Sequence, residues 1–479
     1  MKKLWALCLC AVMLCALVPG GMAEVRLSPQ HPEVLTLWHY YNGLQQQEFN
    51  TLVRQFNETV GKEMGIIIEP VSQGGVNSLY EHLMAAVRGD IGAAQMPDIC
   101  AAYADTVYEV SRLDLVADLS AYMTADEMSE YVDAYMQEGA MNEAGKLKLF
   151  PTAKSTEMML VNKTEWDAFA AETGATVEQL ATWEGVVDVS RMYWQWSDAK
   201  TDTPNDGKAF FGRDSFANYI IIGAYQLGAE ICRVENGEVV LTVDHDVMRR
   251  LWDNYTVPYV NGWFGAYGRF RSDDVKTGLL TALVGSTSGA LYFPDSVTMD
   301  DGTSYPIECM PLPLPGFEGT EPCAVQQGAG LFVKSSTPER EYAAMVFLRW
   351  FTQTENNIDF CIGSGYLPVM KEANRIEVME EMMDRRQVSG LLRNIIEVGV
   401  QITGNYDLYT NTAFENGNEV RSVIDKSMSS WAQNALAERD ALVAGGVAWD
   451  DAVAMLTGDD AFEAWYAQFS LDLARAVGR

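Results

Sequence analysis

The sequence is poor in basic residues for its length. Its 479 residues include 34 Lys and Arg against 66 Asp and Glu, so the formal net charge is −32 at pH 7. No stretch carries the clustered Lys and Arg side chains that displace counterions from phosphates, and we therefore expect no nucleic-acid partner. An anionic membrane surface is disfavoured for the same reason. At 48% hydrophobic residues the chain is a folded globular protein, and its length predicts two or more domains.

Long apolar runs are also scarce, and the clearest lies at the N-terminus over residues 4–18. It is too short to span a bilayer comfortably, it follows Lys2 and Lys3, and small residues at 21–23 offer a cleavage position. We predict a Sec-type signal peptide over residues 1–23 and a periplasmic or extracellular mature protein. Each cysteine in the run follows a leucine, where a lipoprotein signal has a small residue, so no lipid anchor is expected.

Few cysteines remain after that segment. The five are Cys100, Cys232, Cys309, Cys323 and Cys361, an odd number at wide spacing that fits neither a zinc ribbon nor a dense disulfide scaffold. Cys309 and Cys323 close a short loop and could pair in an oxidising compartment. Separate buried thiols are the commoner arrangement, and both possibilities stay open.

The usual catalytic patterns are missing. The segment 285–289 has the glycines of a nucleophile elbow but carries Thr287 at its centre, where serine is required. The four histidines are scattered, and none is spaced to share a metal with another. We therefore expect no enzyme, no metal and no cofactor. The many carboxylates leave one alternative open, an exported carbohydrate-active hydrolase with an acidic pair.

Strands and helices alternate from the start of the mature chain. Apolar runs at 34–38, 65–71 and 97–101 predict strands, and apolar residues at helical spacing over 49–56 predict a helix between the first two. Ser78 and Glu81 form a capping-box pattern at the start of a second helix. Such alternation favours parallel pairing, with a ligand crevice at the carboxyl ends of the strands. The loops after Trp38 and Asp98 are expected to line it.

Aromatic residues recur near polar loop residues. Aromatic rings stack on the C–H faces of sugars while polar groups hydrogen-bond to the hydroxyls, so this pattern is typical of carbohydrate binding. For each ring, packing in a core is the competing interpretation. The candidate rings include Trp38, His39, Tyr41, Tyr103, Tyr267 and Tyr366.

Several segments together resemble a known family. They are residues 37–41, Asn57, residues 97–99, residues 154–157 with 162–163, and residues 365–369. In this order they are similar to the extracellular solute-binding proteins, family 1, which are the substrate-binding subunits of ABC importers for sugars. The likeness covers nearly the whole mature chain. Within the family it is strongest to the glycerol-3-phosphate-binding members.

The resemblance implies an α/β fold of the periplasmic-binding-protein type II, with two lobes joined by hinge strands. Each lobe would be a mostly parallel sheet flanked by helices. We expect lobe I to comprise residues 24–148 and 295–350, and a helix-rich lobe II to comprise residues 149–294 and 351–479. Ligand contacts to both lobes would stabilise a closed state that a membrane permease recognises.

The resemblance also implies a binding site. It places Ser155, Ser288, Gly328 and Tyr366 at the cleft, with Asp105 as an approximate match to an acidic residue of the family. The full predicted set of ligand-binding residues is Trp38, His39, Tyr41, Asn42, Tyr103, Asp105, Ser155, Thr156, Tyr267, Ser286, Ser288, Gly328 and Tyr366.

The late segment 402–406 lacks an arginine that would match the phosphate-binding arginine of the glycerol-3-phosphate-binding members. Losing a bidentate cation removes the strongest phosphate contact, so a neutral sugar, oligosaccharide or polyol is the expected solute. Arg269 or Arg271 could substitute. The expected partners are this solute and the transmembrane subunits of an ABC permease, with the binding protein itself a monomer. A module that presents its solute to a chemoreceptor or sensor is a further alternative.

Overall fold

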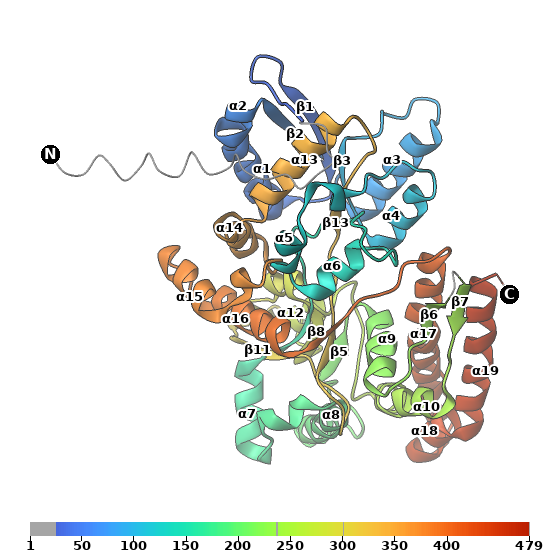
Figure 1. The fold of residues 1–479 in the computed structure, drawn as a ribbon. Helices are drawn as coiled ribbons and strands as arrows, with labels where there is room; N and C mark the ends of the chain where they lie inside the picture. The colour runs from blue at the N-terminus through green and yellow to red at the C-terminus, as the bar shows by residue number, and fades with distance from the viewer. Residues whose placement is uncertain (1–24, 236–237, 300, 479) are drawn as a thin grey trace.

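The computed structural model describes residues 25–235, 238–299 and 301–478, so the predicted signal peptide lies outside the described residues. The chain forms two four-stranded sheets, each flanked by helices, with connecting segments that pass between them (Figure 1). Within the described ranges, no helix is long and apolar enough to cross a membrane.

The first sheet contains the strands predicted near the N-terminus. Its order is β13-β3-β1-β2, formed by β1 (Glu33–His39), β2 (Ile66–Ser72), β3 (Ile99–Ala102) and β13 (Gly330–Val333). β1 pairs in parallel with β2 and β3, whereas β13 pairs antiparallel with β3. The parallel pairing expected from strand–helix alternation is therefore confirmed for β1, β2 and β3.

The helices around this sheet follow the predicted apolar spacing. They are α1 (Gly43–Glu58), α2 (Val60–Met64), α3 (Val76–Arg88), α4 (Ala104–Ser111), α5 (Ala125–Ser129), α6 (Asp133–Gly139), α13 (Pro338–Phe351) and α14 (Thr354–Ser364). α1 buries Phe49 and Phe56 on one face, as expected. The predicted capping box at Ser78 is wrong, because α3 begins two residues earlier and has Gly75 as its N-cap.

The second sheet differs from the expected mostly parallel arrangement. Its order is β11-β4-β8-β5, formed by β4 (Glu157–Asn162), β5 (Phe211–Arg213), β8 (Ala282–Ser286) and β11 (Cys309–Pro313). β4 pairs antiparallel with both β8 and β11, and only β5 and β8 are parallel. β4 and β8 are far apart in the chain with several helices between them, so local alternation does not determine their relative direction.

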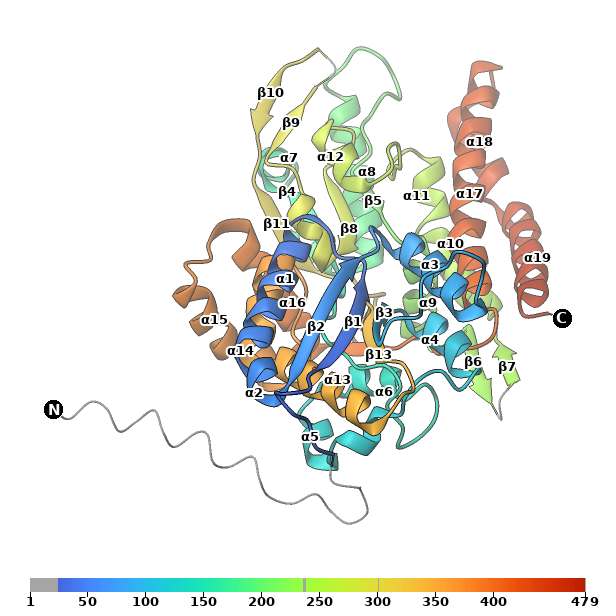
Figure 2. The same cartoon turned by 90° about the horizontal axis from the view of Figure 1, so that it is seen from above.

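Shorter strands and many helices complete the second half. The strands are β6 (Cys232–Glu235), β7 (Glu238–Leu241), β9 (Ser296–Thr298), β10 (Ser304–Pro306), β12 (Cys323–Val325) and β14 (Asp407–Tyr409). The helices are α7 (Lys163–Thr173), α8 (Trp183–Asp198), α9 (Phe216–Gln226), α10 (His245–Asp253), α11 (Thr256–Val260), α12 (Arg271–Lys276), α15 (Ile376–Arg385), α16 (Gly390–Asn405), α17 (Gly417–Ala444), α18 (Trp449–Thr457) and α19 (Asp459–Ala476). Figures 1 and 2 show α17, α18 and α19 standing together at one side.

Two large hydrophobic cores accompany the two sheets. One draws on residues 35–153 and 329–369, and the other on residues 158–324 and 395–476. Val297, Ile307 and Leu314 are buried in the second core, although we expected residues 295–350 to belong entirely to lobe I. The lobe boundaries stay a proposal. The cores favour assigning residues 295–324 to lobe II, because β11 pairs with β4.

Short connecting segments join the two halves. Ser155 and Gln327 exchange two backbone hydrogen bonds of 2.8 and 2.9 Å, and Lys154 and Leu367 exchange two of 3.0 and 2.6 Å. Both pairs are isolated antiparallel bridges outside the sheets. They occupy the position expected of hinge strands.

All five described cysteines are free thiols. Cys309 lies in β11 of the second sheet and Cys323 in β12, which pairs with β14 instead. The separate thiols are therefore confirmed, and the alternative Cys309–Cys323 bridge is not formed.

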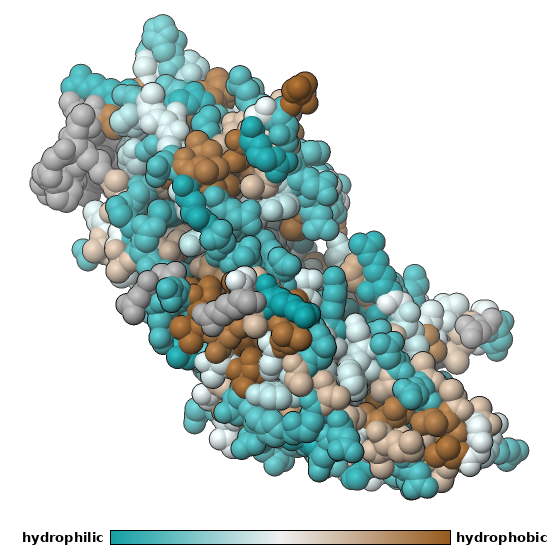
Figure 3. All heavy atoms as spheres, turned by 90° about the vertical axis from the view of Figure 1, so that its right-hand side faces the viewer, coloured by the Kyte–Doolittle hydropathy of each residue, from teal (hydrophilic) through white to brown (hydrophobic). Residues whose placement is uncertain are grey.

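Polar residues predominate on the face in Figure 3, with apolar residues in scattered groups.

Candidate functional site

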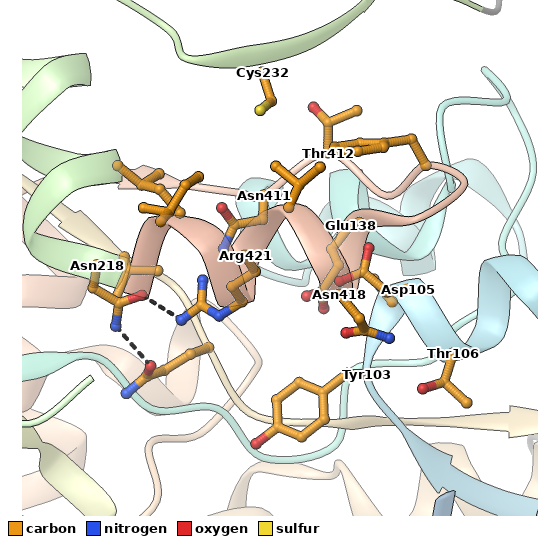
Figure 4. Close-up of a pocket in the computed structure, with 18 of the residues that line it drawn as sticks. Tyr103, Asp105, Thr106, Glu138, Asn218, Cys232, Asn411, Thr412, Asn418 and Arg421 are labelled. Carbon is orange, nitrogen blue, oxygen red and sulfur yellow. Dashed lines mark hydrogen bonds between the residues drawn. The ribbon is translucent and has the colours of Figure 1, made fainter. Parts of the chain in front are cut away.

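A cavity of about 630 Å³ lies between the two halves of the molecule. Its lining comes from α3, the start of α4 and the end of α6 on one side, and from α9 and α17 on the other. Residues 325–327, 409, 411 and 412 of the connecting segments also line it (Figure 4). We call it the interlobe cavity. Its volume lies within the range of roughly 300–1,000 Å³ that is usual for small-molecule sites.

Three of the polar residues on the lobe I side of the cavity are Tyr103, Asp105 and Glu138. Tyr103 directly follows β3 and is the N-cap of α4, and Asp105 lies in the first turn of that helix. Glu138 comes from α6. One of its oxygens pairs with Lys154 Nζ, and the other accepts a 2.9 Å hydrogen bond from Gln326 Nε2. The strand-to-helix connection therefore places a ring and a carboxylate at the cavity.

The surroundings raise the pKa of Asp105 to about 6. Burial of the carboxylate is the main cause, and the negative charges of Glu138 and Glu109 raise it further. The charge of Arg421 and the backbone amide of Phe414 act in the opposite direction without offsetting the burial. Near neutral pH the Asp105 carboxylate is thus charged in an environment that solvates it poorly.

A buried hydrogen-bond network fixes the opposite wall. Arg421 of α17 donates to Asn218 Oδ1 of α9 at 2.7 Å (Figure 4). Asn218 Nδ2 donates to Glu157 Oε1 at 2.8 Å and to Gln327 Oε1 at 3.3 Å. Glu157 also accepts from Arg213 at 2.6 Å, and both side chains of that ion pair are 1% exposed. The network fixes Asn218, which orients the Arg421 guanidinium beside the cavity.

Of the predicted site residues, the structure brings Tyr103 and Asp105 to the interlobe cavity. Four others pack in the lobe I core, namely Trp38, His39, Tyr41 and Tyr366. Tyr366 hydrogen-bonds through its hydroxyl to the Tyr40 hydroxyl at 3.1 Å. Packing in a core, the competing interpretation for aromatic residues, describes the surroundings of these four.

His39 is fully buried at the end of β1, against the rings of Tyr41 and Phe49. Its Nδ1 accepts the Tyr41 amide at 3.2 Å, while Nε2 has no partner among the described residues. Burial lowers the pKa of His39 to about 4, so the ring is neutral at physiological pH.

The remaining predicted residues lie in the connecting segments, in lobe II or on the surface. Ser155 and Thr156 are buried, and Gly328 accepts a 2.8 Å bond from Lys154 Nζ through its carbonyl oxygen. Ser286 and Ser288 hydrogen-bond to each other at 2.9 Å. Asn42 and Tyr267 are exposed. Ligand binding by the residues outside the cavity stays a prediction.

Glu138, Asn218, Gln326 and Arg421 line the cavity but were not predicted. Arg421 carries a signal that could have been found, because it is a late arginine a short distance beyond residues 402–406. Of the proposed substitutes, Arg271 is buried in an ion pair with Asp274. Neither Arg269 nor Arg271 lines the cavity. Among the described residues, no group of His, Cys, Asp and Glu is placed to hold a metal.

A family model described as bacterial extracellular solute-binding protein matches residues 51–384. The chain therefore belongs to this family, and the likeness stated from its motifs is confirmed. The members of the family are binding proteins, and its description places them outside the cell membrane. No curated protein sequence matches.

Solved structures confirm the two-lobed α/β fold. The cyclic α-maltosyl-1,6-maltose-binding protein of Arthrobacter globiformis is 17% identical, with 91% of this chain and 100% of that chain covered and a TM-score of 0.66. UgpB of Mycobacterium tuberculosis, in complex with glycerophosphocholine, is 16% identical, with 93% and 99% covered and a TM-score of 0.64. The maltose/maltodextrin-binding domain MalE of Bdellovibrio bacteriovorus, bound to maltotriose, is 12% identical, with 93% and 100% covered and a TM-score of 0.61.

Proposed function

We propose that this solute-binding protein captures a carbohydrate or polyol outside the inner membrane, closes around it, and delivers it unaltered to an ABC permease. One observation carries the proposal. The interlobe cavity offers hydrogen-bond acceptors from Asp105, donors from Arg421 and the aromatic ring of Tyr103. A hydroxyl group donates and accepts at once, so a polyhydroxylated solute satisfies both kinds of group.

The cavity has walls from both halves of the chain, which suits capture by hinge closure. A ligand that touches Asp105 on one wall and Arg421 on the other stabilises the closed arrangement through its differential affinity for that state. The sugar-binding proteins with the same fold are consistent with this solute class.

Hydrolysis is the alternative, because the carboxylates of Asp105 and Glu138 line the cavity in addition to the exposed Glu81, and the pKa of Asp105 is raised into the range of a general acid. Glu138 does not complete such a pair. Its two oxygens are already engaged by Lys154 and Gln326, so it is not available as a nucleophile or as a base for water. We therefore propose binding without catalysis.

Calorimetry tests the proposal, with solutes taken from native mass spectrometry of the gently purified mature protein. We expect a mono- to trisaccharide or a polyol to bind saturably and to be recovered intact. Tyr103→Ala should weaken its binding at least tenfold, because a stacking ring is lost. Tyr292→Ala is the matched control, since that ring is 70% exposed and outside the cavity, and the affinity of this variant should stay within about twofold of the wild type.

Two results would contradict the proposal. One is catalytic consumption of the glycan by the purified protein. The other is equal affinity of the Tyr103→Ala and Tyr292→Ala variants for the identified solute.

A further inference from the structure

The charged residues that line the interlobe cavity are unequal in sign. In the described part of the chain they are Glu81, Asp105 and Glu138 against the single cation Arg421. Glu138 is neutralised by Lys154, which lies behind the wall and is itself fully buried. The remaining balance is still acidic, with the exposed Glu81 at α3 and Asp105 against one guanidinium. The cavity therefore repels a net-anionic solute.

One buried acceptor in the same lining has an unmet hydrogen-bonding need. Gln326 is 3% exposed, and its Nε2 donates to Glu138. Its Oε1 has no partner within the described residues. A buried carbonyl oxygen without a donor is unfavourable, so a solute group that donates to Oε1 would gain from this position.

Glu138 connects this acceptor to Asp105. It holds the Gln326 amide through Nε2, and its charge contributes to the raised pKa of Asp105. We call Asp105, Glu138 and Gln326 the acidic wall. Asp105 supplies a poorly solvated negative charge, Gln326 supplies a free acceptor, and Glu138 positions the Gln326 side chain.

The charge of Arg421 acts on Asp105 without offsetting its burial, so the acidic wall is only partly neutralised by Arg421. Its guanidinium is turned toward Asn218 on the opposite side, and the hydrogen bond of 2.7 Å is to that residue (Figure 4). Asp105 and Glu138 lie on the other side of the same view. Asp105 and Gln326 both line the cavity, so a group with a positive charge and several N–H donors finds an anionic and a neutral acceptor in this lining.

We propose that the acidic wall binds a protonated amino group, so that the solute is an amine-bearing carbohydrate such as an amino sugar. This inference rests on the proposed function and narrows its substrate class. A neutral hydroxyl donates to one acceptor at a time, whereas an ammonium group donates three hydrogen bonds and neutralises the Asp105 charge. Arg421 would hold hydroxyl or ring oxygens at the other end of the solute.

The test uses pairs of sugars that differ in one group: D-glucose with D-glucosamine, D-galactose with D-galactosamine, and D-mannose with D-mannosamine. Each is titrated calorimetrically into the mature protein at pH 7.5. In at least one pair we expect the amino sugar to bind at least tenfold more tightly, about 1.4 kcal/mol. The inference is overturned if, in every pair that binds, the neutral sugar binds equally well or better.

Asp105→Asn tests the assignment to the acidic wall. It keeps the side-chain size and removes the charge, so the ratio of amino-sugar to neutral-sugar affinity should fall at least fivefold. Asp133→Asn is the matched control, because Asp133 lies on α6 with Glu138 but its side chain is 88% exposed and paired with Lys371. The ratio of amino-sugar to neutral-sugar affinity of Asp133→Asn should match that of the wild type. An Asp105→Asn ratio equal to that of the control would overturn the assignment.

The proposed function fails in a different way. If the folded wild-type protein bound no sugar or polyol, including maltotriose and glycerol, and no such mass co-purified, carbohydrate capture itself would be wrong. Tight binding of a neutral sugar with no preference for its amine would leave capture intact and overturn only the narrower inference.

Discussion

The buried ion pair between Lys154 and Glu138 provides the sharpest stability prediction. Lys154 is fully buried, and its Nζ pairs with Glu138 and donates to the Gly328 carbonyl at 2.8 Å. Lys154→Met keeps much of the side-chain volume but leaves the Glu138 carboxylate without its cation. Removing one partner of a buried pair costs about 3–5 kcal/mol, so we expect a loss of that size in the free energy of unfolding.

A second substitution separates the ion pair from simple packing. In the Lys154→Met/Glu138→Gln double variant no uncompensated charge remains, and Gln326 Nε2 can still donate to the amide oxygen at position 138. We expect the double variant to recover more than half of the loss, which is about 2 kcal/mol or more of the free energy of unfolding. The unrecovered part reflects the lost hydrogen bond to Gly328.

The assay is urea unfolding at pH 7.5, with the midpoint and slope of each variant compared. Lys163→Met is the matched control, because Lys163 pairs with Asp167 on the surface, where the two side chains are 42% and 57% exposed. Surface pairs contribute about 0–1 kcal/mol, so this variant should change little. The reasoning is refuted if Lys154→Met costs no more than Lys163→Met, or if the double variant is as unstable as the single one.

Three further predictions concern single side chains. Burial holds the pKa of His39 near 4, against about 6.5 in the unfolded chain, so the unfolded state takes up the proton first as the pH falls. The free energy of unfolding should therefore fall by about 3 kcal/mol between about pH 6.5 and pH 4. Thermal melts of His39→Asn should lack this part of the slope, and an unchanged slope would contradict it. For Asp105 the pH dependence of stability has the opposite sign. Its folded pKa of about 6 exceeds the unfolded value near 3.9, so stability is lost as the pH rises from about 3.9 to 6. Asp105→Asn should therefore be about 1–3 kcal/mol more stable than the wild type at pH 7, as measured by chemical denaturation. A destabilised Asp105→Asn protein would contradict this sign. Gly328 has φ of +101°, and a Cβ added to it would lie 3.2 Å from the Ala153 oxygen, so Gly328→Ala should lower the free energy of unfolding by about 1–2 kcal/mol. Gly289→Ala is the control and should cost less, because no atom lies within 4 Å of a Cβ added there. Equal urea midpoints for the two variants would show that alanine is not strained at position 328.

The first half of the fold could be predicted because its signals are local. β1 and β2 each contain a short apolar run with a helix between them, and Phe49 and Phe56 mark the buried face of that helix. A helix between two strands that follow each other in the chain provides the crossover that parallel strands need, so parallel pairing is favoured. The pairing of β4 with β8 and β11 has no such local signal, since each partner is more than a hundred residues away.

The same difference between local and long-range signals explains which residues of the candidate site could be predicted from the sequence. Tyr103 and Asp105 follow β3 directly, so the rule that ligands lie beyond the carboxyl ends of parallel strands predicts them from sequence. Asn218 and Arg421 lie on helices separated by about two hundred residues, and they meet only because α9 packs on α17. No residue spacing within either helix predicts that contact. The Tyr103 and Asp105 part of the lobe I wall is therefore predictable from local sequence, whereas the position of Arg421 on the lobe II wall depends on tertiary packing. A substitution in the contact between α9 and α17 is expected to alter solute affinity without touching the solute.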